Sequence, residues 1–438
     1  MKKIVLLLYI NLICISSVTK AQTDKTWTLQ ECINYAFEQN IQVRKSEISN
    51  QRFGIYADQA KAQRLPSVNG SINQSFNWTR NSTTGTALKG SNSSNYSVNS
   101  GVTIYNASKI SNQIRQAELD MEGGTYSLET TKESICLNIL NAFLQVIYAE
   151  EQVKNSMKQI ESTAGQLNLA QERLALQVIS QADYSQVKSQ MASEKLTLAN
   201  SESQLAIAKV NLMQLMELPM NSDFKVEQPD LGDSLNQNRI PDVKVVYETA
   251  LGIKPQVKSA AINKKIAEID EKIAKAGYFP TLSASAGLTS GFSSQTSDPY
   301  FDQINTGVHP SAGFSLSILI YQRKQIKTNI AVAKIGYQDA ELSETDTKNQ
   351  LRKNIEQACL DVTSAQIEYE ATIEKYQATQ EASALSDEKF RQGIINSVDY
   401  LVSKTNLIVA ESQLLQSKFN LIFSYKILDF YMGVPLTL

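Results

Sequence analysis

The amino-acid sequence predicts a mainly α-helical protein that also carries membrane-spanning β-strands. Two pairs of segments alternate apolar and polar residues over the length of a membrane strand. Long stretches carry apolar residues at the 4,3 spacing of coiled coils, and the second half of the chain repeats the first. We therefore expect a duplicated helix-hairpin-helix plan, with four long coiled-coil helical rods and four β-strands in each chain.

The strand prediction begins with Ser67 to Trp78, which follows the helix-ending pair Leu65-Pro66 and has one apolar and one polar face. A strand that crosses a bilayer at a tilt needs about 9–11 residues, so this segment is long enough. A similar segment follows Phe279-Pro280. The four predicted strands cover about 67–80, 95–105, 281–292 and 311–321. The residues predicted to face lipid are Val68, Ile72, Phe76, Trp78, Val98, Val102, Ile104, Leu282, Leu288, Phe314, Leu316 and Ile318.

Four strands cannot close a barrel. An open strand edge in hydrocarbon leaves unpaired backbone groups, each of which costs several kcal/mol. The barrel is therefore expected to close by oligomerisation. Aromatic residues near the strand ends are interpreted as interfacial girdles, with ordinary strand aromatics as the alternative; they are Trp78, Tyr96, Tyr105, Phe292 and Tyr321.

Residues 1–21 read as a secretory signal peptide. Lys2-Lys3 precede an apolar run from Ile4 to Ile15, and small residues lead to a cleavage site after Ala21. The run is too short to span a membrane. Cys14 follows Ile13 rather than a small residue, so we favour a cleaved, unlipidated start over a lipoprotein.

Composition and motifs exclude several classes of function. With a net charge of −2, the chain lacks the excess of positive charge that is typical of nucleic-acid-binding proteins, so no nucleic-acid partner is expected. There is no nucleophile-base arrangement, metal cluster or phosphate-binding loop, and we therefore predict no enzymatic activity, no metal site and no cofactor. The only histidine, His309, lies in a predicted loop. Cys32, Cys136 and Cys359 are interpreted as small packed residues.

The internal duplication covers nearly the whole mature chain. An offset of 214 residues places Pro66 on Pro280, and an offset of 216 places Asp183 on Asp399. The predicted organisation is the signal peptide at 1–21, repeat 1 at 22–219, an equatorial linker at 220–246 and repeat 2 at 247–438.

Each repeat predicts one helix before the hairpin and two after it. The first helices are expected at about 29–65 and 246–279, and the long helix of repeat 1 at about 107–177. Coiled-coil seams are predicted in the two long helices at Ile135, Ile139, Ala142, Val146, Ala149 and Val153 and at Leu351, Ile355, Ala358, Val362, Ala365 and Tyr369, and in the last helix of repeat 1 at Ala192, Leu196, Ala199, Ser203, Ala206, Val210 and Met213. Charged residues on the helices are expected to face solvent. Gly123-Gly124 falls within that long helix, and we expect a bend there because mid-helix glycines are unfavourable. The hairpin loops at 81–95 and 293–310 are rich in Ser, Thr, Asn and Gly, and we expect them to be exposed tips.

These features together resemble the TolC family of outer-membrane efflux proteins. The local marks occur twice and in order: Ala60 to Pro66 and Ala274 to Pro280, Arg173 to Tyr184 and Lys389 to Tyr400, and the closing pairs Leu218-Pro219 and Val434-Pro435. The resemblance implies a homotrimer with a shared twelve-stranded β-barrel in outer-membrane lipid and an α-helical barrel across the periplasm. It also implies a periplasmic adaptor (membrane fusion protein) and an inner-membrane RND or ABC transporter as partners.

The resemblance places the candidate site residues at the turns between the long and short helices. The second turn matches the family pattern with Lys389, Gly393 and Asp399, whereas the first has Arg173 and Asp183 but Gln177 in place of glycine. One Asp399 from each protomer would form an acidic ring at the periplasmic mouth that favours cations. The alternative interpretation is that Asp183 and Asp399 cap helices.

The sequence therefore predicts an outer-membrane exit duct for small molecules or proteins, including type I secretion substrates. The alternative is a structural or adaptor coiled-coil protein of the periplasm. An envelope hydrolase has no supporting residues.

Overall fold

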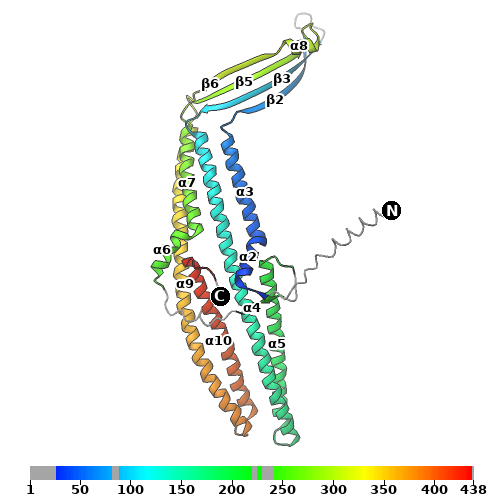
Figure 1. Ribbon diagram of the computed structural model, residues 1–438, viewed down its shortest axis with the longest axis vertical. Coiled ribbons are helices and arrows are strands. Elements are labelled where there is room, and N and C mark those ends of the chain that lie inside the picture. Colours follow the sequence, from blue (N-terminus) through cyan, green and yellow to red (C-terminus); the bar gives the residue numbers. More distant parts are fainter. Residues whose placement is uncertain (1–25, 81–87, 220–223, 229–240, 437–438) are drawn as a thin grey trace, which may run out of the picture. The chain divides into compact units, whose positions relative to one another are not determined.

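The computed structural model describes residues 26–80, 88–219, 224–228 and 241–436 (Figure 1). The predicted signal peptide at 1–21 and much of the predicted linker at 220–246 lie outside the described residues. The chain forms two compact units. We call Met1–Lys45, Thr130–Lys254 and Gln350–Leu438 the helical unit, and Ser46–Glu129 with Pro255–Asn349 the sheet unit.

The helical unit contains the paired helices that follow each hairpin. It holds α5 (Gln181–Leu215), α10 (Ser397–Met432) and the larger parts of α4 (Lys109–Ala175) and α9 (Gln325–Arg391). The shorter elements are β1 (Thr26–Trp27), α2 (Leu29–Gln39), β4 (Lys225–Val226) and α6 (Val243–Ile253), and β1 pairs with β4 in parallel. The predicted coiled-coil seams are buried here, at Ile135, Ile139, Val146, Leu351, Ile355 and Val362.

The sheet unit contains α7 (Pro255–Ala276), most of α3 (Ile41–Ala62) and the four long strands. These are β2 (Ser67–Arg80), β3 (Leu88–Tyr105), β5 (Thr281–Ser293) and β6 (His309–Ser317). They form one antiparallel sheet in the order β2-β3-β5-β6, with a bulge between Thr103 and Tyr105 (Figure 1). Both β2 and β6 are therefore edge strands.

The strand registers place the apolar residues of all four strands on one face. Ile72 pairs with Tyr96 and Val98 with Leu288. Leu282 pairs with Leu316. Because side chains alternate along a strand, the serine, asparagine or threonine that follows each of these residues lies on the opposite face. Within this chain the apolar face is exposed, as Ile72 at 73% and Phe314 at 79% illustrate.

Some predicted boundaries of the sheet differ from the structure. β3 begins at Leu88 rather than near 95, and β6 covers His309–Ser317 rather than 311–321, so Ile318 and Tyr321 lie beyond the strand. The predicted loop at 293–310 contains a short helix, α8 (Tyr300–Thr306). The polar composition of this segment predicted a loop, whereas Tyr300 packs on Phe292 of β5 and fixes the helix to the sheet.

The helix expected before each hairpin is broken in two. Asn40 separates α2 from α3 and accepts a hydrogen bond from the backbone N–H of Gln42 (2.9 Å). In the second repeat, Pro255 begins α7, and the residue before a proline is disfavoured in the helical conformation. The prediction of one continuous helix was wrong in both repeats. It relied on the spacing of apolar residues and did not take account of the helix-ending effects of Asn40 and Pro255.

The bend or irregularity expected at Gly123-Gly124 does not interrupt α4, which is continuous from Lys109 to Ala175. A Cβ added to Gly124 would lie 2.7 Å from Phe53 Cδ2 and 2.8 Å from Asn50 Oδ1. Gly124 therefore allows α3 to approach α4 closely. This packing offsets the low helix propensity of glycine.

No helix in the described part of the chain combines the length and the apolarity needed to cross a membrane.

Within the described residues Cys32, Cys136 and Cys359 are free thiols, of which Cys32 and Cys359 are buried. Burial raises the pKa of Cys136 to about 11, with a further contribution from Glu133. These observations confirm the interpretation of the cysteines as packed apolar residues.

The close approach at Gly124 predicts opposite effects for two glycines of α4. Gly124→Ala should destabilise the protein by about 1–3 kcal/mol, because the added methyl group overlaps Phe53 and Asn50. Gly165→Ala should stabilise it by up to about 1 kcal/mol, because nothing lies within 4 Å of the added Cβ. Thermal unfolding followed by circular dichroism measures both. Equal changes in the two variants would contradict the packing role of Gly124.

Candidate functional site

The candidate site residues lie at the two turns of the helical unit, α4 to α5 and α9 to α10. At the second turn Gly393 has a φ of 74°, in the left-handed region. The backbone N–H of Ile394 donates to the carbonyl oxygen of Lys389 (2.9 Å), which closes the end of α9. The first turn has the same geometry with Gln177 at a φ of 58° and a bond from Val178 N–H to the Arg173 carbonyl oxygen (2.9 Å).

The N-caps of the helices that follow the turns are Ser180 and Asn396, and each aspartate lies three residues further on. Ser180 and Asp183 form a capping box at the start of α5, in which Asp183 Oδ2 accepts from the Ser180 backbone N–H (3.2 Å). At the start of α10, Asn396 Oδ1 accepts from the Asp399 backbone N–H (2.9 Å), and Asn396 Nδ2 donates to Asp399 Oδ2 (3.0 Å). The capping interpretation therefore fits Asp183, which accepts from a backbone N–H, but not Asp399, whose carboxylate accepts from a side chain.

Asp183 also connects the first turn to the second. Its Oδ1 accepts a hydrogen bond from Ser397 Oγ (2.5 Å). The hydrogen bonds from Ser180 and then Ser397 hold the pKa of Asp183 below its usual value. Both carboxylate oxygens of Asp183 therefore accept hydrogen bonds within the protomer, and one of these bonds joins the two turns. Asp399 is exposed and accepts only from its neighbour Asn396 in the interactions described here.

Arg173 forms a second connection between the turns. Its guanidinium donates to the carbonyl oxygen of Arg391 (2.8 Å) and lies 6.0 Å from the centre of the Phe390 ring. Phe390 stacks on Tyr400, with ring centres 4.7 Å apart and an angle of 14° between the rings. The five predicted site residues are thus brought to one end of the helical unit, with Lys389 contributing its backbone carbonyl oxygen.

A buried polar network lies next to these turns. It was not predicted from the sequence. Lys404 of α10 is 5% exposed, and its Nζ lies 3.6 Å from Oε1 of Glu194 on α5, which is 6% exposed. Lys404 also donates to Thr163 and Gln166 of α4. Burial lowers the pKa of Lys404, and the charge of Glu194 opposes this shift.

Tyr400 extends the network towards the turns. Its side chain is 3% exposed, and its hydroxyl accepts a hydrogen bond from Gln166 Nε2. Burial, followed by the nearby charge of Asp387, raises the pKa of Tyr400 to about 12. Three helices are therefore held together here by polar side chains rather than by a continuous apolar seam.

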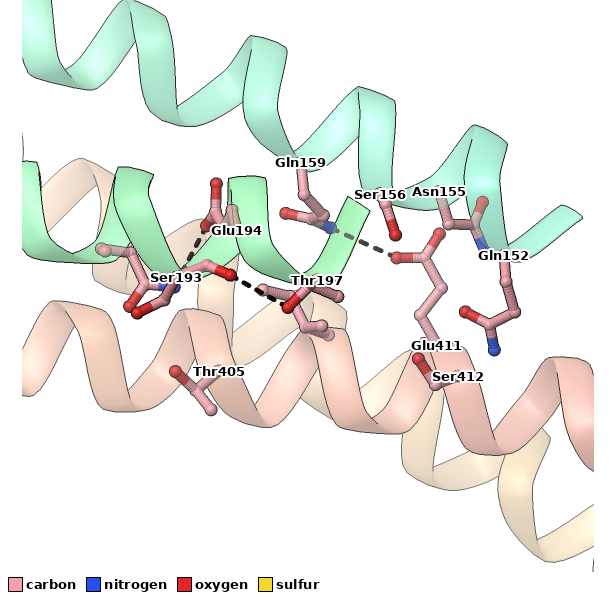
Figure 2. Close-up of a pocket in the computed structure, with 12 residues that line it drawn as sticks. Gln152, Asn155, Ser156, Gln159, Ser193, Glu194, Thr197, Thr405, Glu411 and Ser412 are labelled. Carbon is pink, nitrogen blue, oxygen red and sulfur yellow. Dashed lines mark hydrogen bonds between the residues drawn. The ribbon is translucent and has the colours of Figure 1, made fainter. Parts of the chain in front are cut away.

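A small polar pocket of about 190 Å³ lies beside the network, between α4, α5 and α10 (Figure 2). Gln159 Nε2 donates to Glu411 Oε2 across it (3.3 Å). Glu194 lines the pocket, and its Oε2 is buried without a hydrogen-bond partner. The amides, hydroxyls and carboxylates of the lining suit water more than an apolar ligand.

One sequence signal could have revealed the network. Glu194 and Lys404 have opposite charges and both fall within helices predicted to be coiled coils, where a charge at a core position is unusual. The predicted seam of α5 included the neighbouring Ala192 and Leu196, which are exposed in this chain. Within the protomer α5 packs through a face other than the predicted seam. Glu194 lies on that face, so the apolar spacing wrongly placed it in solvent.

Comparisons with known proteins identify the family. A family model described as "Outer membrane efflux protein" matches residues 32–217 and 246–434. Toxin and drug export protein A of Aggregatibacter actinomycetemcomitans is 20% identical over 400 residues, which cover 90% of this chain and 83% of that protein. The pyoverdine export outer membrane protein OpmQ of Pseudomonas aeruginosa is 26% identical over 178 residues, 40% of this chain and 36% of OpmQ.

Solved structures share the fold. The open state of the Neisseria gonorrhoeae MtrE outer membrane channel aligns with a TM-score of 0.76 at 17% identity and covers 96% of this chain and 94% of MtrE. The Campylobacter jejuni CmeC outer membrane channel aligns with a TM-score of 0.76 at 16% identity, over 92% of this chain and 85% of CmeC.

The buried Lys404–Glu194 pair predicts a strong asymmetry between single and double replacement. Lys404→Met should destabilise the protein by about 3–5 kcal/mol, because it leaves the Glu194 carboxylate buried without its cation. The double variant Lys404→Met, Glu194→Met should recover most of this loss. Denaturant unfolding of the purified proteins measures both. A single variant as stable as the double one would show that the pair is not buried as described.

Proposed function

The chain belongs to the outer membrane efflux protein family, and on this premise we propose that it is one third of a trimeric exit duct that works with a periplasmic adaptor and an inner-membrane pump. The family assignment itself makes the protein an efflux channel of the outer membrane with a large periplasmic helical part. It decides against the alternative of a periplasmic structural coiled coil. Because the family consists of channels, we assign the chain a transport role and no reaction.

The open sheet supports a trimer. β2 and β6 are both edge strands, so each protomer offers two unpaired backbone edges to neighbouring copies. Three four-stranded sheets joined through these edges give a twelve-stranded barrel. The helical unit supports the same proposal, because α5 exposes apolar residues of its predicted seam, including Leu196 at 63% and Val210 at 39%. A neighbouring copy would cover this surface.

In this barrel the apolar face of the sheet contacts lipid and the polar face lines the channel. The proposed lipid-facing residues within the strands are Val68, Ile72, Phe76, Trp78, Val98, Val102, Ile104, Leu282, Leu288, Phe314 and Leu316, with Ile318 just beyond β6. The opposite face carries hydrogen-bonding side chains such as Ser71 and Ser97, whose Oγ atoms are 2.7 Å apart. This division matches the outward apolar band and polar interior of membrane barrels.

The turns of the helical unit are proposed as the periplasmic mouth and the contact for the adaptor. Arg173 and Asp183 join the two turns within the protomer, while Lys389 and Gly393 shape the second turn. Asp399 is exposed, and a trimer would repeat it three times around the channel axis. We propose that these three carboxylates form the acidic ring, which attracts cations by Coulomb interaction.

The proposed organisation of the chain follows the duplication: a signal peptide at 1–21, repeats at 22–219 and 247–438, and an equatorial linker at 220–246. The proposed cargo is small molecules or proteins. The names of the relatives, which include pyoverdine export and toxin and drug export, are compatible with this range.

The proposal predicts cation-selective conduction that depends on Asp399. The purified protein should insert into planar bilayers as a trimer and conduct ions. Asp399→Asn should reduce the cation preference, measured as a shift of the reversal potential in a salt gradient, and should leave the trimer yield unchanged. Asp361→Asn is the control, because this exposed carboxylate lies on α9 about 45 Å before the turn.

Identical reversal potentials for the wild type and Asp399→Asn would remove Asp399 from the constriction. A bilayer that stays electrically silent with the wild-type protein would contradict the duct itself.

A further inference from the structure

The short helix α8 (Tyr300–Thr306) is fixed to the outer end of the sheet by several contacts. The Tyr300 hydroxyl is hydrogen-bonded to the Tyr96 hydroxyl of β3, and the Tyr300 ring lies 4.8 Å from that of Phe292 on β5, centre to centre. Ser290 Oγ donates to the Ile304 carbonyl oxygen (2.6 Å). Gln303 exchanges two hydrogen bonds with the backbone of Ser293 (2.9 and 3.2 Å). α8 is therefore a docked element rather than a free loop.

The side chains that α8 contacts all belong to the apolar face of the sheet. Ser290 pairs with Tyr96 in the sheet register, and Phe292 pairs with Ser94, so these four residues point to the same side. Ile72 pairs with Tyr96 on that side as well. Ser94 is 5% exposed, which places it under the docked segment. α8 thus covers the apolar face and leaves the opposite, polar face uncovered.

An apolar groove adjoins α8 on this face. It measures about 500 Å³, and the residues that line it include Ile72, Tyr96, Val98 and Leu288, with Val308 contributed by the residue pair that links α8 to β6. These four strand residues have the parity of the exposed apolar face, and Ser71, Ser97 and Thr289, of the opposite parity, also border the groove. The groove is therefore continuous with that face.

α8 lies at the end of the β5–β6 hairpin that is remote from the helices, and the groove extends from α8 towards the middle of the strands. Strands β2 and β5 each begin after a helix, and β3 and β6 each lead into one, so all helix connections are at the other end of the sheet. In an outer-membrane protein with periplasmic helices, α8 is on the side of the outer leaflet. Phe301 of α8 is 75% exposed next to the Tyr300 ring, a placement typical of residues that insert at a membrane interface.

We propose that α8 is a lipid-binding element on the outer wall of the barrel, and that the groove beside it holds an acyl chain of an outer-leaflet lipid. Phe301 enters the same interface from the exposed side of α8. The proposal rests on the assignment of the apolar face to lipid. On this proposal α8 does not cover the channel opening, because it docks on the lipid side of the sheet.

Tryptophan fluorescence quenched by brominated lipid tests this inference. A background without tryptophan (Trp27→Phe, Trp78→Phe) carries one new tryptophan at a time, at Phe301 and Val308 for the proposed site. Phe314→Trp and Ser315→Trp are the matched controls, because these adjacent residues of β6 lie outside the groove and on opposite faces of the sheet. Each protein is reconstituted in vesicles of phosphatidylcholine with or without bromine on the acyl chains.

Bromine should quench the tryptophans at 301, 308 and 314 several-fold more strongly than the one at 315. Quenching at 301 and 308 as weak as at 315, together with strong quenching at 314, would overturn the inference while leaving the barrel intact. Strong quenching at 301 without quenching at 308 would exclude an acyl chain from the groove. Equal quenching at 314 and 315 would instead contradict the facing of the sheet, and with it the proposed function.

Discussion

The unpaired edges of β2 and β6 are the constraint on which the rest of the structure depends. Water can satisfy an exposed strand edge, but hydrocarbon cannot, so a four-stranded sheet in a bilayer has to find further strands. In the described part of the chain, the two hairpins provide the four strands of this sheet, and the separate pair β1-β4 adds none to it. The proposed closure by three identical copies would cover the apolar residues that the helices expose in one protomer, and it would repeat the turns three times around one axis.

The duplication reproduces the backbone plan while its two copies are stabilised differently. At the break before each hairpin, repeat 1 uses Asn40, whose Nδ2 donates to the Leu215 carbonyl oxygen (2.8 Å). The corresponding Lys254 is 2% exposed, pairs with Glu133 (3.1 Å) and lies 3.2 Å from the centre of the Phe430 ring. Burial lowers the pKa of Lys254 against the opposing charge of Glu133. One backbone break is thus held by an amide and the other by a buried cation.

The repeat, the strand faces and the capped turns could be predicted from sequence because each depends on local periodicity or on a short motif. The coiled-coil seam through Ile139 and Ile355 was found in this way. Features that depend on contacts between distant segments were not predictable. Phe53 and Asn50 leave no room for a side chain at Gly124. Lys404 is buried against Glu194, which is far from it in the sequence. The position of α8 depends on contacts of Tyr300 with Tyr96 and Phe292. In each case the local signal alone favoured a different answer.

Disulfide crosslinking between β2 and β6 tests trimer closure most directly. Within one chain these edges are separated by two strands, or about 14 Å, which is too far for a disulfide. We predict that cysteine pairs combining Ser71, Asn73 or Ser75 with Ser311, Gly313 or Ser315 include some that give, on oxidation in membranes, a covalent species of three chains and nothing larger. Chains that remain monomeric for every pair, or a ladder that extends beyond three, would contradict a barrel closed by three copies.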